Sequence, residues 1–224
     1  MDAISYDARK TALLFVDPYN DFLSEGGKLW PLIKPVVEEV GLLDNLRTID
    51  KAVRAAGIQV MIVPHRRWQP SDYKCWCHPN PSQLGIMKGH VFARGEWGGE
   101  WHPDFAPQQG DVVIAEHWAQ SGFANTDLDL QLKQHGISHV ILVGLLANTC
   151  IESTARFAME LGYRVTLVRD ATAAFKREMM HAAHELNGPT FAHRIVTAAQ
   201  LVQALAKTLR WRTRDSPIFH LKRI

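Results

Sequence analysis

The chain has 224 residues, 46% of them apolar, and a formal net charge of +2. This length predicts one domain that spans residues 1–224, and the apolar fraction is enough to bury a full core. The weak charge, the absence of an apolar run of membrane-spanning length and the lack of a signal-peptide pattern lead us to expect no nucleic-acid or membrane partner. Three cysteines, an odd number, do not indicate a disulfide framework and favour a reducing cytoplasm.

Short apolar runs alternate with longer amphipathic segments along the chain. The apolar runs predict strands at residues 12–16, 59–64, 112–115, 139–143, 164–168 and 194–196. Helices are predicted at residues 36–56, 127–135, 149–161, 177–186 and 198–209. Pro35, Gly57, Gly162 and Thr197 supply start or stop signals for these helices. Repeated β-α-β units predict an α/β fold with a parallel sheet and helices on both faces.

Two segments depart from this alternation. Residues 66–109 are rich in Trp, Pro, Gly and His and show no clear period, so we interpret them as an insertion. Its aromatic side chains fit a substrate pocket, a subunit contact or a mixture of both. Residues 210–224 form a basic tail, which we expect to be solvated or to contact a subunit.

Three predicted strands end in residues that carry chemistry. The first strand is followed by Asp17, the third by Glu116 and His117, and the fourth leads through a turn to Cys150. Parallel α/β sheets bind ligands beyond the carboxyl ends of their strands. A carboxylate, an imidazole and a thiol at one sheet edge can perform nucleophilic catalysis.

Each of these residues also has a structural interpretation. Cys150 falls in the first turn of a predicted helix, where the helix dipole favours the thiolate, but it could equally be a small packed side chain. Asp17 could be a turn residue before Pro18, and His117 could be packed beside Trp118. Asp21 is expected to cap a turn or to bind backbone amides.

Four motifs in order resemble the isochorismatase-like cysteine hydrolases, over about residues 10–203. They are Val16-Asp17-Pro18-Tyr19-Asn20-Asp21-Phe22, Ser121-Gly122-Phe123-Ala124-Asn125-Thr126-Asp127-Leu128, Gly144-Leu145-Leu146-Ala147-Asn148-Thr149-Cys150, and Gly162-Tyr163 with Asp170-Ala171. The resemblance implies a three-layer α/β/α, Rossmann-like fold with a six-stranded parallel sheet. It also implies a homodimer or homotetramer, and hydrolysis of amides or related C–N bonds through a thioester by an Asp–Lys–Cys triad.

By position, Asp17 matches the aspartate of this triad and Cys150 its nucleophile. The family's lysine lies six residues before Phe123, where this chain has His117. A register shifted by one would place Glu116 there, but neighbours in a strand point to opposite faces, and we prefer His117. This histidine could act as an imidazolium beside the thiolate or as the base that takes the thiol proton. A pH-dependent rate is expected in either role.

The turn before Cys150 is expected to form the oxyanion site. The backbone N–H groups of Leu146 and Cys150 are its predicted donors. The resemblance implies a cis peptide in this turn, at Leu145–Leu146. Predicted substrate contacts come from side chains near the strand ends and from the insertion: Phe22, His65, Trp68, Trp118, Phe123 and Leu146.

No metal or other cofactor is expected. The Cys75-Trp76-Cys77-His78 cluster, with His65, His90 and His102, does not have a usual zinc spacing. Metal-binding nicotinamidases of the family use an Asp-x-His pair after the second strand. Here Val63-Pro64-His65 lacks the carboxylate.

The sequence therefore predicts a cysteine-dependent hydrolase of a small amide, ureide or related C–N substrate. A second interpretation is hydrolysis of a vinyl ether or ester, as in the isochorismatases, which lack the cysteine. A third is a binding protein that lost catalysis with the lysine. Trp and Phe side chains suit an apolar or aromatic substrate.

Overall fold

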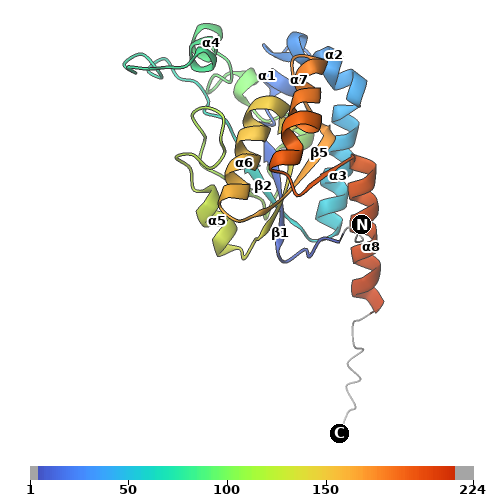
Figure 1. Ribbon diagram of the computed structural model, residues 1–224. Helices are drawn as coiled ribbons and strands as arrows, with labels where there is room; N and C mark the ends of the chain where they lie inside the picture. The colour runs from blue at the N-terminus through green and yellow to red at the C-terminus, as the bar shows by residue number, and fades with distance from the viewer. Residues whose placement is uncertain (1–4, 215–224) are drawn as a thin grey trace.

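The computed structural model describes residues 5–214, without the side chains of residues 208–214 (Figure 1). Its centre is a six-stranded parallel sheet with the strand order β3-β2-β1-β4-β5-β6. The strands are β1 Thr11–Val16, β2 Gln59–Val63, β3 Val112–Val113, β4 His139–Leu145, β5 Arg164–Ala173 and β6 Arg194–Val196. The predicted α/β fold and its parallel sheet are confirmed.

Helices cover both faces of the sheet and lie over the carboxyl ends of its strands (Figure 1). The helices are α1 Asn20–Leu23, α2 Trp30–Val40, α3 Leu42–Ala55, α4 Pro81–Gly89, α5 Leu128–Gln134, α6 Glu152–Glu160, α7 Arg177–His181 and α8 Ala198–Arg214. Short 3-10 turns occur at Trp97–Gly99, Pro103–Phe105 and Gly188–Thr190, and π-type turns at Ala147–Ile151 and Ala182–Asn187. Within residues 5–214, no helix has the length and apolarity needed to cross a membrane.

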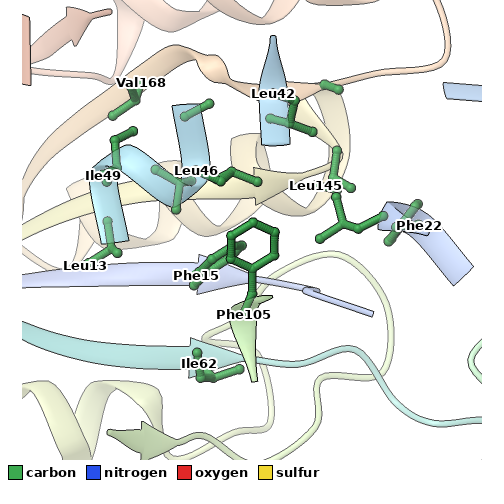
Figure 2. Packing of buried hydrophobic residues seen from close by; sticks show 14 of the residues in the cluster. Leu13, Phe15, Phe22, Leu42, Leu46, Ile49, Ile62, Phe105, Leu145 and Val168 are labelled. Carbon is green, nitrogen blue, oxygen red and sulfur yellow. The ribbon is translucent and has the colours of Figure 1, made fainter. Parts of the chain in front are cut away.

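The sheet is buried on both faces because its strands alternate between two apolar clusters. In β1, Leu13 and Phe15 belong to the cluster under α2, α3 and α8, whereas Leu14 and Val16 belong to the cluster under α5 and α6. Figure 2 shows the first cluster, in which Leu46 of α3 packs among side chains of the sheet. This double burial explains why the strands read as continuous apolar runs.

Two predicted boundaries are wrong for identifiable reasons. The helix predicted at 36–56 is split into α2 and α3 because Gly41 adopts a left-handed conformation with φ 66°. The fifth strand continues to Ala173, past polar residues that interrupt its apolar run. The insertion at 66–109 also contains a helix, α4, which Asn80 caps with a capping box that closes on Gln83.

Gly144 sets the close approach of β4 to β1 at the carboxyl edge. Its φ is 109°, the pairing of β4 with β5 shifts register between Leu142 and Gly144, and a Cβ atom here would collide with the backbone of Val16. No residue with a side chain fits this position without movement of β1. Because Val16 precedes Asp17, the glycine also determines where Asp17 lies.

Replacing this glycine tests that constraint. We expect Gly144→Ala to lower the free energy of unfolding by more than about 2 kcal/mol, because it adds a backbone clash to an unfavourable φ. Gly136→Ala is the matched control, since Gly136 has φ 66° and open space around its Cβ position. Its expected cost is about 1 kcal/mol. Urea unfolding measures both variants, and equal losses would contradict the proposed contact.

Candidate active site

Asp17, His117 and Cys150 meet at the carboxyl edge of the sheet. One side-chain atom from each, a carboxylate oxygen, a ring nitrogen and the sulfur, lie within 4.8 Å of one another. Asp17 and His117 are fully buried and Cys150 is 7% exposed. Residues separated by more than 130 positions in the sequence thus form one cluster of a carboxylate, an imidazole and a thiol.

Backbone contacts hold Asp17 at the end of β1. Its N–H donates to Val63 O at 3.1 Å, and its own carbonyl accepts from Tyr19 N at 2.8 Å. Its φ of 55° is left-handed, which turns the chain sharply after the strand. The side chain is therefore directed by a strained turn that β2 supports.

His117 is held by an extension of β2. A parallel bridge joins His65 and His117, in which His117 N donates to Pro64 O at 2.9 Å and His117 O accepts from Arg66 N at 2.8 Å. Its neighbour Glu116 points away and accepts hydrogen bonds from Arg66, Arg67 and Arg94. The alternative register with Glu116 beside the thiol does not occur.

Both ring nitrogens of His117 face oxygen atoms. Nδ1 lies 3.1 Å from the carbonyl oxygen of Ala119, and Nε2 lies 3.1 Å from Asp17 Oδ1. The other carboxylate oxygen, Asp17 Oδ2, is buried and has no hydrogen-bond partner among the described residues. One carboxylate oxygen is thus engaged by the imidazole and the other is open.

Cys150 differs from the expectation of a readily ionised thiol. It lies in the π-type turn Ala147–Ile151, which leads into α6. Burial, followed by the negative charge of Asp17, raises the pKa of Cys150 well above its usual value. The Thr149 hydroxyl and the Leu146 N–H oppose this shift without cancelling it. The resting thiol is neutral and needs a base to become a nucleophile.

The backbone before Cys150 presents the predicted oxyanion segment. The peptide bond Leu145–Leu146 is cis, as the resemblance implies. Leu146 O accepts from Thr149 N and Ile151 N, each at 3.1 Å, which closes a tight loop around the sulfur. The N–H of Leu146 is directed at the sulfur, next to which a substrate carbonyl would lie.

A cavity of about 520 Å³ opens onto Asp17 and Cys150. It is bounded by α1, α4, the turn before α6 and the segment around α7. Its apolar lining consists of Phe22, Leu29, Pro81, Gly85, Ile86, Val91, Phe92, Ala119, Leu146, Phe175 and Met179. Its polar lining consists of Asp17, His65, Ser82, Gln120, Asn148, Thr149 and Cys150. The volume fits a small organic molecule.

Of the six predicted substrate contacts, Phe22, His65 and Leu146 line this cavity. Trp118 instead lines an adjoining hollow of about 390 Å³, together with Trp76. Trp68 is stacked on His90 with ring centroids 4.1 Å apart, and Phe123 packs against Tyr163 in the core. Trp68, Trp118 and Phe123 therefore do not line the cavity that holds Cys150, and their contact with substrate stays a prediction.

Most of the cavity's lining is absent from the prediction. The predicted fifth strand ends at residue 168, five positions short of Ala173, so the prediction does not bring Phe175 and Met179 to the sheet edge. Ile86 was missed because α4 was not predicted. Asn148 lies two residues before Cys150, so its place in the turn could have identified it as a lining residue. Its Oδ1 atom is buried without a hydrogen-bond partner among the described residues.

Asp21 attaches the insertion to the site. Its carboxylate accepts from Lys28 N at 2.9 Å and from Phe92 N at 2.6 Å, as the prediction of a backbone-binding role requires. Tyr19 donates to His65 O at 2.8 Å and stacks on Trp101. The first strand end thereby holds Phe92 and His65, which line the cavity.

The cysteines and histidines considered above as zinc ligands do not form one site. Cys75 and Cys77 are exposed, whereas His65 is buried at the cavity and His102 stacks on Phe105. Among residues 5–214, metal-binding atoms of three side chains instead come close together at Asp17, His117 and Cys150.

Comparisons with known proteins match this chain over most of its length. Residues 11–200 match the Isochorismatase domain. The chain is 30% identical over 201 residues to a ureidoacrylate amidohydrolase RutB of Pantoea ananatis, which covers 85% of this chain and 80% of the relative. It is 32% identical to the protein of the same name from Yersinia enterocolitica, over 85% and 86% of the two chains.

Solved structures show the same fold. A cysteine hydrolase from Pseudomonas syringae superposes with a TM-score of 0.73 at 24% identity, over 92% of this chain and 96% of the other. An N-carbamoylsarcosine amidase from Thermoplasma acidophilum gives a TM-score of 0.65 at 30% identity, over 84% and 96%.

The raised pKa of Cys150 predicts its alkylation behaviour. Near neutral pH, iodoacetamide should modify Cys75 and Cys77 before Cys150, because the first two are exposed and the third is buried and protonated. Asp17→Asn removes a charge that raises this pKa, so alkylation of Cys150 should begin at lower pH. Asp44→Asn, on the surface, is the control. Mass mapping over time measures all three thiols, and early modification of Cys150 in the unaltered protein would contradict the description.

Proposed function

The chain belongs to the isochorismatase family, and from this premise we propose that it is a cysteine-dependent amidohydrolase that cleaves a C–N bond of a small amide or ureide. The observation that carries the proposal is the cluster of Asp17, His117 and the Cys150 thiol, of which Asp17 and Cys150 line a cavity. The relatives named as ureidoacrylate amidohydrolase and N-carbamoylsarcosine amidase support the bond type.

His117 acts in this proposal as a positive charge. The carbonyl of Ala119 only accepts hydrogen bonds, so Nδ1 carries a proton. Nε2 faces Asp17 Oδ1 at 3.1 Å, and a carboxylate oxygen only accepts hydrogen bonds, so we place a proton on Nε2 as well. The ring is then an imidazolium paired with a carboxylate, and it supplies the charge that the family's lysine supplies elsewhere.

Asp17 is the proposed base. Its Oδ2 atom has no hydrogen-bond partner among the described residues, and its carboxylate lies close to a thiol that is neutral at rest. When a substrate enters, this oxygen takes the thiol proton as the sulfur attacks the carbonyl carbon. When the thiol proton moves to Asp17, the negative charge moves to the sulfur. The imidazolium remains bound to Oδ1 and compensates this buried charge.

The reaction then has two balanced stages. The C=O electron pair moves to oxygen, where N–H groups of Leu146 and Cys150 would stabilise the oxyanion. As that pair returns, the C–N bond breaks, the leaving nitrogen takes the proton from Asp17, and a thioester remains. Water, deprotonated by Asp17, attacks the thioester, and the sulfur leaves and regains its proton. The net change is amide plus water to acid plus amine or ammonia.

The cavity favours a neutral substrate with an apolar body. Among the described residues, neither lysine nor arginine lines it. Burial and the charge of His117 lower the pKa of His65 to about 4, so this histidine is neutral at pH 7. A substrate carboxylate would be buried without a cation to pair with, which is costly. The unpartnered Asn148 Oδ1 is suited to accept an amide N–H of the substrate.

We also propose that the protein acts in the cytoplasm, where the thiol stays reduced, and as a homodimer or homotetramer. Exposed apolar side chains such as Phe157 and Leu161, one turn apart at the end of α6, support a subunit contact.

Variants at the triad test the chemistry through ammonia release from primary amides. Cys150→Ala should abolish turnover. His117→Gln keeps a polar side chain but loses the charge, and should lower kcat/KM by about 10²–10³-fold. His117→Lys restores a fixed charge and should have a higher kcat/KM than His117→Gln. The control is His78→Gln, on the surface. Turnover by Cys150→Ala at the unaltered rate would overturn the proposal.

Paired substrates test the cavity. Benzamide should be hydrolysed with a kcat/KM more than about tenfold above that of 4-carboxybenzamide, since only the second buries a charge. Ureidoacrylate, another carboxylate, should be a poor substrate. Ile86→Lys adds a cation to the lining and should narrow the difference between the two benzamides. A preference of the unaltered enzyme for the carboxylates would show that the neutral-substrate assignment is wrong.

A further inference from the structure

We propose that Asp17, His117 and Cys150 form a reversible binding site for a thiophilic divalent cation, with Zn²⁺ as the fitting ion, and that occupation of this site blocks the enzyme. The metal binding stands on the geometry alone, whereas the block of turnover rests on the proposed function. The site follows from the histidine at position 117, because a lysine ammonium offers no lone pair and repels a cation.

The donor atoms are of the right type and spacing. Zinc prefers Cys sulfur, His nitrogen and carboxylate oxygen, and in tetrahedral sites its bond lengths of about 2.0–2.3 Å place these ligand atoms about 3.3–3.6 Å apart. Here Asp17 Oδ1 and His117 Nε2 are 3.1 Å apart, and all three donor atoms lie within 4.8 Å of one another. Side-chain shifts of about an ångström complete the three-ligand arrangement.

The imidazole is already oriented as a ligand. Its Nδ1–H is directed at the carbonyl oxygen of Ala119, which fixes the ring and presents Nε2 to Asp17 and Cys150. Histidines that bind metals usually donate their second ring N–H to such an acceptor. A second, independent feature is the buried Oδ2 of Asp17, which is without a hydrogen-bond partner among the described residues and needs a cation or a donor.

Zinc binds Cys as the thiolate and His through an unprotonated ring nitrogen, so the ion would replace protons at Cys150 Sγ and His117 Nε2.

The cavity supplies the route and the fourth position. It reaches both Asp17 and Cys150, so an ion can enter and a water molecule can complete tetrahedral coordination. The bound ion would use the sulfur lone pair that attacks the substrate and the carboxylate that takes its proton. Nucleophile and base would both be unavailable while the ion is present.

Direct binding is the test, in a Cys75→Ser/Cys77→Ser background that removes the exposed thiols. Calorimetric titration with ZnCl₂ should give one site per chain and release of protons. Titration with CoCl₂ should give a thiolate-to-cobalt charge-transfer band. Both signals should weaken by about tenfold or more in Cys150→Ala and in His117→Lys, with thermal unfolding used to show that each variant is folded.

The outcomes separate the two proposals. Binding of equal strength in His117→Lys, or no binding in the background protein, would overturn the metal site whatever the activity. If amides are hydrolysed, micromolar Zn²⁺ should inhibit and EDTA should restore the rate, and stimulation by Zn²⁺ would overturn the inhibitory role. If no amide is hydrolysed but cobalt binds through Cys150, the proposed function fails and the metal site stands.

Discussion

The hydrogen bond between Asp17 and His117 is the constraint on which the site depends. It joins two fully buried titratable side chains 3.1 Å apart, one directly after β1 and the other in the segment that follows β3. Neither charge would be stable there alone, because burial of an unpaired ion costs several kcal/mol. In our account the pair satisfies both residues, leaves one carboxylate oxygen open for the thiol and keeps Cys150 protonated until substrate arrives.

The backbone around this pair is built to hold it. Gly144 allows β4 to pass close to Val16, which sets the position of Asp17, and the bridge between His65 and His117 continues β2 beyond its last residue. Glu116, bound by three arginines, holds the opposite side of the same segment. The chemistry therefore relies on tight backbone contacts at one sheet edge, where small shifts would separate the donor atoms.

The sheet and the three central residues could be predicted because their signals are local. Apolar runs identify strands, and Asp17, His117 and Cys150 each follow one at a sheet edge that parallel topology makes common. Beyond Phe22, His65 and Leu146, the cavity's apolar lining could not be predicted, because residues such as Phe92, Ile86 and Met179 reach it through packing of the insertion and of the segment after β5. The direction of the Cys150 pKa shift was also missed: turn position favours ionisation, but burial and the nearby carboxylate outweigh it.

The protonation of His117 distinguishes a charge partner from a base, and it also determines how many protons a metal ion would displace. The most direct measurement is ¹⁵N NMR of the His117 ring in the resting protein at pH 7, assigned by comparison with His117→Gln. Our account predicts that both ring nitrogens carry protons. The one-bond ¹⁵N–¹H coupling of Nε2–H should be observed in the unaltered protein and lost in Asp17→Asn. A neutral ring with one unprotonated nitrogen would contradict it.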